Sequence, residues 1–319
     1  MRRREFIALF GSALASSRAA RAQRPAKPKI GVLIISNKEP FWSLLKKGLR
    51  EVGYIEGENI QIELRSAEGL AANLPTLAAE LVRLKVDIIV ATPTPCVHAA
   101  KAATADIPIV MVAAGDPVNT GLVASLSRPG GNVTGTSSAA SEITEKTLEL
   151  FREILPSMRR VAILVNPPDP FAKPFIEHIE RAAKTMSMTA DIYMIHAQEE
   201  LDAAFAQISQ KHLDAVVLQA TLPRKQAADL AIKYRLPITC TASRFTGDAG
   251  GLLSYSFNIE ELYRKSVVYI DKILKGAKPT DLPVQEPTKF TLSINLKTAK
   301  AIGITIPPSL LARADEVIE

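Results

Sequence analysis

The sequence predicts an α/β protein made of two doubly wound, Rossmann-like lobes, each built on a parallel sheet. Three observations lead to this fold class. Near-continuous apolar runs alternate with amphipathic helical patterns, which is typical of parallel strands covered by helices on both faces. The apolar runs recur later in the chain at a nearly constant spacing. The 319 residues also exceed a typical single domain.

The first 22 residues have the layout of a bacterial export signal. Three arginines at 2–4 precede a short apolar run over 6–15, and residues 20–22 read Ala-Arg-Ala, an A-x-A cleavage pattern. The stretch 3–7, RREFI, also resembles the twin-arginine (Tat) signal. We therefore predict a periplasmic protein, exported by the Tat rather than the Sec route and cleaved near Ala22. An uncleaved amphipathic segment or a transit peptide is the alternative.

The charge of the chain belongs largely to this signal. The formal net charge is +6, but residues 1–22 contain five Arg and one Glu, which leaves about +2 for the mature chain. Nucleic-acid binding needs a clustered basic face, so we expect no nucleic-acid partner. No later segment reaches the roughly 18 apolar residues of a membrane span, so we expect a soluble mature protein.

Cysteine and histidine usage gives little support to a metal site or a cofactor. Cys96 and Cys240 lie in different halves, near strand ends, and are poor disulfide partners even in an exported protein. The chain has four scattered His and neither a C-x-x-C nor an H-E-x-x-H motif. We expect no metal and no cofactor.

In the first half, apolar runs predict strands within 28–37, 86–95 and 107–117. Helical periodicity predicts helices over 40–54 and 73–86 between them. The apolar stripe of the first helix consists of Phe41, Leu44, Leu45, Leu49 and Val52, and Gly53 ends it.

The second half repeats this order. Strands are predicted within 159–168, 213–223 and 236–244, with helices over 174–186 and 198–211. The three strand pairs are offset by 131, 127 and 129 residues. We interpret this as two similar units in tandem, with chance similarity of buried strands as the alternative.

Small polar residues follow the strands in both halves. In "VDIIVATPTP" (86–95), an apolar run ends in two hydroxyls held between prolines, which can neither continue a helix nor donate to a sheet ladder. Open parallel sheets bind ligands beyond the carboxyl ends of their strands. Two facing lobes would place both sets across one cleft. The candidates at strand ends are Ser36, Asn37, Thr92, Thr94, Gly115, Asp116, Asn166, Gln219, Thr221, Thr241 and Ser243.

The mature chain resembles the periplasmic solute-binding proteins of ABC importers, in the subgroup that includes tryptophan- and tyrosine-associated binding proteins. The most specific stretch is "GDPVNTGLVASLSRPGGNVTG" (115–135). The resemblance implies the type I periplasmic binding protein fold, with crossover strands and hinge closure over a solute. It places the first lobe at 28–135 plus about 257–284, and the second at 136–256 plus about 285–319.

The resemblance also implies further ligand contacts. They come from the loop after the first strand, the first crossover, the loop after Asn166 and the return crossover. These segments add Phe41, Trp42, Ser137, Phe171 and Tyr255 to the candidates.

Most candidates have a structural alternative. Trp42 either stacks a planar ligand or packs on its own lobe. Phe41 and Phe171 either clamp an apolar body or pack within loops. The hydroxyls of Thr92, Thr94 and Ser137 suit a ligand carboxylate, but they also suit helix capping. Asp116 either holds an ammonium group or caps a turn before Pro117.

We predict a binding protein without catalytic residues, which captures a solute and delivers it to an inner-membrane ABC permease as a monomer. The expected solute is an amino acid or a small organic acid, aromatic ones included, and a sugar is the alternative. A receptor-linked sensor is a rival function. An exported enzyme is a weaker rival, because the G-x-S-x-G, G-x-G-x-x-G and Walker A motifs are all missing.

Overall fold

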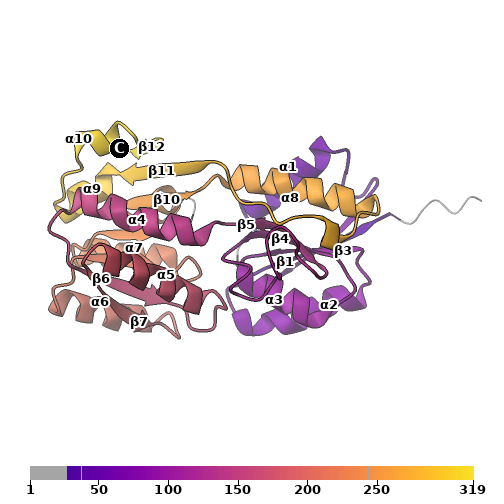
Figure 1. The fold of residues 1–319 in the computed structure, drawn as a ribbon, viewed down its shortest axis with the longest axis horizontal. Helices are drawn as coiled ribbons and strands as arrows, with labels where there is room; N and C mark the ends of the chain where they lie inside the picture. The colour runs from indigo at the N-terminus through magenta and orange to yellow at the C-terminus, as the bar shows by residue number, and fades with distance from the viewer. Residues whose placement is uncertain (1–26, 37, 243) are drawn as a thin grey trace, which may run out of the picture.

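Two lobes lie side by side in the computed structural model, which describes residues 27–319 except 37 and 243 (Figure 1). The predicted α/β class is confirmed, because each lobe is a largely parallel sheet with helices on both faces. The export signal and the candidates Asn37 and Ser243 lie outside the described residues. Within them, no helix combines the length and the apolar content that crossing a membrane requires.

The sheet of the first lobe has the strand order β2-β1-β3-β4-β5, and all its pairs are parallel. Alternate residues of β1 face opposite layers, as the pleat of a strand requires. Ile30 and Val32 pack with α1 and α8, whereas Leu33 packs with α2 and α3. The strands are β1 Lys29–Ile34, β2 Gln61–Ser66, β3 Ile88–Thr92, β4 Ile109–Ala114 and β5 Val133–Ser137.

The helices of the first lobe form one layer on each side of this sheet (Figure 1). The predicted stripe of α1 buries Phe41, Leu45 and Leu49. Val52 was predicted in the stripe but is 37% exposed, because α1 ends at Glu51 and the chain turns away there. The helices are α1 Phe41–Glu51, α2 Leu74–Arg83, α3 Thr94–Ala103 and α8 Ile259–Leu274, with short 3₁₀ turns η1 Ala71–Asn73 and η3 Pro279–Asp281.

The sheet of the second lobe has the order β12-β11-β10-β9-β8-β6-β7, parallel except for the β10–β11 pair. The order β7-β6-β8-β9-β10 matches β2-β1-β3-β4-β5, so the repeated apolar runs occupy equivalent places in the two sheets. The strands are β6 Arg160–Val165, β7 Thr189–Met194, β8 Ala215–Leu218, β9 Ile238–Cys240, β10 Leu253–Phe257, β11 Phe290–Asn295 and β12 Glu316–Ile318.

Helices also cover both faces of this second sheet. Val161 and Ile163 of β6 pack with α4 and α5, and the intervening Ala162 packs with α6 and α7. The helices are α4 Ala140–Ile154, α5 Ala172–Thr185, α6 Glu200–Gln210, α7 Arg224–Lys233, the π-helix η2 Phe245–Ala249, α9 Leu296–Ile302 and α10 Pro308–Leu311.

Three linking segments carry the chain between the lobes: β5 to α4, β10 to α8, and η3 to β11 (Figure 1). Two of them run side by side. The Ser137 N–H donates to the Gln285 carbonyl at 2.8 Å, and the Gln285 N–H donates to the Gly135 carbonyl at 3.0 Å. The predicted lobe boundaries fall in or beside these segments and stay a prediction.

Candidate functional site between the lobes

The ends of β3 and β4 are tied together by Thr94, which begins α3. Its hydroxyl accepts a hydrogen bond from the Gly115 backbone N–H at 2.9 Å, and Thr94 is buried. Pro95 stands in the first turn of α3, where its missing N–H would have no helical partner. The prolines therefore end the strand and start the helix at one point. Thr92, the last residue of β3, is half-buried beside this tie.

The second lobe brings three of its predicted residues into one hydrogen-bond network. The Asn166 N–H donates to Gln219 Oε1 at 2.8 Å, and Asn166 Nδ2 donates to Thr221 Oγ1 at 3.1 Å. Gln219 Nε2 and Thr221 Oγ1 both donate to Asp169 Oδ2 at 2.9 Å. The loops after β6 and β8 are thus joined by one largely buried polar network.

Asp169 is the centre of this network, and sequence analysis did not single it out. The Phe171 N–H donates to its Oδ1 at 2.9 Å, and the side chain is 4% exposed. Burial raises the pKa of Asp169, although the hydrogen bonds from Phe171, Thr221 and Gln219 oppose that shift. Its position between two prolines after a buried strand was the available sequence signal.

Phe171 of the second lobe reaches the first lobe at Gly115. A Cβ added to Gly115 would lie 2.9 Å from Cγ of Phe171, so only glycine allows the two loops to approach this closely. The ring of Phe171 also packs on Phe175 of α5, with centroids 5.8 Å apart. Two predicted residues, one from each lobe, are therefore in contact.

Asp116 makes the second contact between the lobes. Its Oδ2 lies 3.0 Å from Nε2 of His178 on α5, and the same nitrogen lies 2.7 Å from the hydroxyl of Ser141 on α4. Within its own lobe, Asp116 accepts hydrogen bonds from the backbone and side chain of Asn119. Burial alone would raise the pKa of Asp116, but the hydrogen bonds from His178 and Asn119 outweigh burial and lower it. His178 sits inside a regular helical pattern, so nothing in the sequence distinguished it.

Carboxylates gather on the linking-segment side of this contact. Burial, followed by the charges of Glu142 and Asp116, raises the pKa of Glu286. These three acids come from α4, the loop after β4 and the segment before β11. The charges of Glu142 and Asp116 therefore disfavour a further negative charge at Glu286.

Three further candidates lie in or just after β5, β10 and β9. Ser137 is 2% exposed, and its hydroxyl accepts the Ala139 N–H at 3.1 Å. Tyr255 of β10 stacks on Phe290 of β11, with centroids 5.6 Å apart. Thr241 is half-buried after β9. Their part in binding stays a prediction.

The remaining first-lobe candidates pack within their own lobe or face solvent. Phe41 is buried against Tyr263 of α8, with centroids 5.2 Å apart. Trp42 packs on the same core, and Lys46 Nζ lies 5.2 Å from its ring centroid. Ser36 is exposed. The hydrogen bonds, ion pairs and ring contacts of the described residues join none of these three to the second lobe, and their role in binding also stays a prediction.

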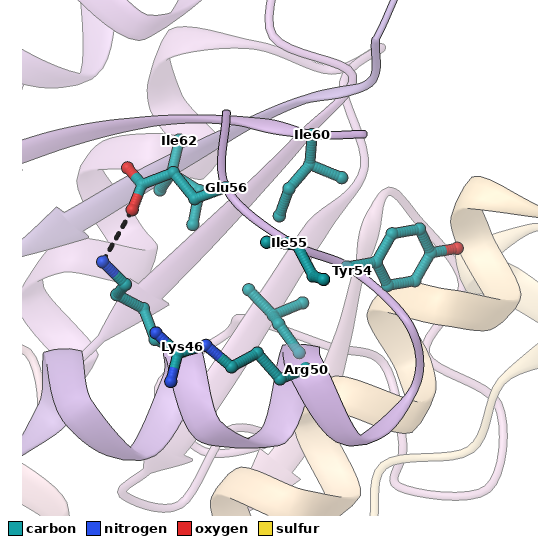
Figure 2. A pocket seen from close by; sticks show the side chains of 8 residues that line it. Lys46, Arg50, Tyr54, Ile55, Glu56, Ile60 and Ile62 are labelled. Carbon is teal, nitrogen blue, oxygen red and sulfur yellow. Dashed lines mark ion pairs between the residues drawn. The ribbon is translucent and has the colours of Figure 1, made fainter. Parts of the chain in front are cut away.

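A separate, small pocket of about 70 Å³ lies on the first lobe between α1 and β2 (Figure 2). Its charged lining is Lys46, Arg50 and Glu56, and Lys46 pairs with Glu56 at 2.7 Å. All its lining residues fall within 46–62, so the second lobe takes no part in it. Closure of the lobes could not enclose a solute there.

In the described part of the chain, neither the two cysteines nor any cluster of metal-ligating side chains indicates catalysis. Cys96 and Cys240 are free and fully buried. Burial raises the pKa of Cys240 to about 11, and it also raises the pKa of Cys96. Both therefore remain thiols at neutral pH. Between residues 27 and 319, apart from the two undescribed positions, no three His, Cys, Asp or Glu side chains cluster as a metal site would require.

Comparison with known proteins gives a family match along most of the chain. The profile of a family described as ABC transporter substrate binding protein matches residues 40–318. The "Tyrosine-binding protein" of Clostridioides difficile (strain R20291) is 30% identical over 264 residues, which cover 81% of this chain and 75% of that protein.

Two solved structures resemble the whole chain to different degrees. The ABC domain in complex with L-Trp from Streptococcus pneumonia is 29% identical, has a TM-score of 0.83, and covers 92% of this chain and 100% of its own. A ligand-free, open substrate-binding protein with adhesive properties from Clostridium difficile is 25% identical, has a TM-score of 0.67, and covers 92% of this chain and 99% of its own. At similar identity, the overall structural similarity is greater to the L-Trp complex than to the open protein.

Proposed function

This chain belongs to the ABC transporter substrate-binding protein family, and from that premise we propose that it captures an aromatic amino acid between its lobes and presents it to a membrane permease. Its fold is that of the type I periplasmic binding proteins, as the resemblance in the sequence implied. The relatives in the comparisons are solute-binding proteins, not enzymes.

The observation that carries the proposal is the apposition of the strand-end loops. Phe171 of one lobe lies against Gly115 of the other, and His178 reaches Asp116. Type I lobes that meet in this way enclose whatever lies between their strand ends. The greater likeness to the L-Trp complex than to the open protein supports a closed arrangement.

The chemistry at the strand ends supports an amino acid as the solute. The hydroxyls of Thr92 and Thr94 are suited to a carboxylate. The acids Asp116, Glu142 and Glu286 favour an ammonium group nearby. A zwitterionic amino acid carries both the carboxylate and the ammonium group, whereas a neutral sugar carries neither. The relatives are described as binding L-Trp and tyrosine, so an aromatic side chain is proposed.

The test is native mass spectrometry and calorimetry on residues 23–319. We expect L-tyrosine or L-tryptophan to bind with one site per chain, and sugars to give no heat. Solute at 100 times its Kd should add about 2.7 kcal/mol to the free energy of unfolding. A flat response to all proteinogenic amino acids would reject the proposed ligand class, and turnover of the solute would support an enzyme instead.

We also propose export by the Tat route with removal of the first 22 residues. The twin arginines at 3 and 4 support it, together with a family whose members act outside the cytoplasm. Replacing both arginines by lysine should retain the protein in the cytoplasm, as cell fractionation would show. Continued export with an unchanged N-terminus would favour the Sec route.

A further inference from the structure

One side-chain hydrogen bond in the described residues joins the two lobes away from the linking segments. It connects Nε2 of His178 with Oδ2 of Asp116 at 3.0 Å, and the two side chains are only 9% and 10% exposed. An ionised carboxylate can only accept a hydrogen bond, so Nε2 must carry the hydrogen, and Nε2–H is then shared between Asp116 Oδ2 and the Ser141 hydroxyl oxygen. Both the neutral Nε2–H tautomer and the imidazolium satisfy this requirement.

Each end of the contact is held in position by its own lobe. Asp116 has φ 41°, a left-handed conformation that Asp and Asn tolerate better than most residues, and Asn119 donates to both of its carboxylate oxygens. His178 is fixed on α5 by Ser141, whose hydroxyl lies 2.7 Å from Nε2. Little side-chain entropy is therefore lost when the lobes bring the two groups together.

We propose that His178 and Asp116 form a clasp that stabilises the closed arrangement and slows release of the solute. This proposal rests on the proposed function. In it His178 is a positioning residue, which acts on affinity through closure and not through contact with the solute.

The clasp acts on one conformation only. When the lobes separate, His178 keeps Ser141 and Asp116 keeps Asn119, but the hydrogen bond between the lobes is lost. A contact that exists only in the closed state raises affinity by shifting the population toward that state. Hydrogen bonds to charged groups contribute enough to make release about tenfold to a hundredfold faster when one is removed.

A purely structural role for His178 makes a different prediction. In that case its bond to Ser141 would fasten α5 to α4 within the second lobe. Loss of the imidazole would then lower the free energy of unfolding without a specific effect on solute release. Release kinetics and lobe closure therefore distinguish the two roles, whereas thermal stability alone does not.

The experiment measures dissociation of L-tyrosine or L-tryptophan by stopped flow, and compaction by small-angle X-ray scattering. We expect His178→Ala to speed dissociation about tenfold or more and to lower the closed fraction at equal solute occupancy. His178→Gln, which keeps an N–H donor, should recover part of the effect. His196→Ala is the matched control, because His196 is exposed on the same lobe. If His178→Ala released the solute at the wild-type rate, the clasp would be overturned.

A double-mutant cycle separates the clasp from direct contact between Asp116 and the solute. Asp116→Asn keeps the tolerance for a left-handed backbone but loses the charge. Its effect on dissociation should shrink in the His178→Ala background, because the partner is already gone. Fully additive effects would refute the clasp. If His178→Ala fails to fold by circular dichroism, His178→Gln against Asp116→Asn decides the same question.

Failure of the proposed function would look different. A wild-type protein that binds neither amino acid refutes the ligand assignment. The clasp is then decided by small-angle X-ray scattering with whichever solute of a wider panel binds the wild type. His178→Ala should compact less than the wild type and His196→Ala at equal occupancy, and equal compaction of all three would refute the clasp.

Discussion

Gly115 is the residue on which the approach of the two lobes depends most directly. Its backbone N–H is bonded to Thr94 inside the first lobe, while its open side faces the ring of Phe171 from the second. The first contact persists whatever the arrangement of the lobes. The second exists only when they are closed, so a methyl group at this position should act on closure and not on folding.

We expect Gly115→Ala to weaken solute binding about tenfold or more while leaving the ligand-free protein almost as stable as the wild type. The new Cβ would stand 2.9 Å from the Phe171 ring, and overpacking of this kind costs about 1 to 3 kcal/mol. Opening of the lobes relieves the clash. Calorimetric titration and urea unfolding measure the two quantities separately.

Gly131→Ala is the matched control for this substitution. A Cβ at Gly131 meets no heavy atom within 4 Å, and its backbone is not left-handed. It should bind as the wild type does. If Gly115→Ala also bound normally, the close approach of the two loops would not belong to the solute-bound form.

At the scale of elements, α8 holds one of the linking segments in place. Glu261 of α8 accepts hydrogen bonds from the hydroxyl and backbone N–H of Thr288, and it pairs with Lys265 at 2.7 Å. Lys265 in turn donates to the Glu286 carbonyl at 2.9 Å. The segment that leads back into the second lobe is therefore fastened to a helix of the first.

This anchor should respond to acid. Burial opposes ionisation of Glu261, but the hydrogen bonds from Lys265 and Thr288 outweigh burial and lower its pKa to about 2. A lowered pKa means that the anchor stabilises the fold fully above the ordinary value of about 4.5 and loses this contribution as the pH falls toward 2. We expect Glu261→Gln to cost about 1 to 2 kcal/mol at pH 7 and progressively less below pH 4.5.

Urea unfolding at pH 7, 4.5 and 3 tests this expectation. The adjacent Glu260→Gln is the control, because Glu260 is exposed and has no described hydrogen bond through its side chain. A difference between Glu261→Gln and the wild type that stays constant over this pH range would show that ionisation of Glu261 does not support the anchor.

The sequence predicted the elements whose residues are strongly patterned. The apolar runs that became β1, β3, β4, β6, β8 and β9 are buried on both faces, so their composition identified them. β2 and β7 lie at the sheet edges with mostly half-exposed side chains, and they have no apolar run to detect. No range was predicted for α3. It consists largely of small residues and begins with Thr94 and Pro95, and this composition is typical of a loop.

At the scale of the whole molecule, the sequence indicated which residues stand at strand ends but not which of them meet. Which residues stand at strand ends follows from strand order and the pleat within each lobe. Which of them meet depends on the relative orientation of two lobes, and no local sequence pattern encodes that orientation. This explains why Gly115 and Phe171 were candidates without a predicted contact, and why His178 on a regular helix was missed.

Affinity and closure should change together when a contact between the lobes is removed. Phe171→Ala deletes the ring that lies against Gly115. We expect about tenfold to a hundredfold weaker binding, and a smaller fall in the radius of gyration on saturation with the solute. Leu70→Ala, at a side chain that is 64% exposed, should change neither.

Thermodynamic linkage makes this expectation strict. If closure strengthens solute binding by some factor, the solute must strengthen closure by the same factor. The shift in closed population measured by small-angle scattering should therefore account for the loss of affinity measured by calorimetry. A Phe171→Ala protein that binds weakly yet compacts as fully as the wild type at equal occupancy would mean that Phe171 contacts the solute itself. It would then not act by joining the lobes.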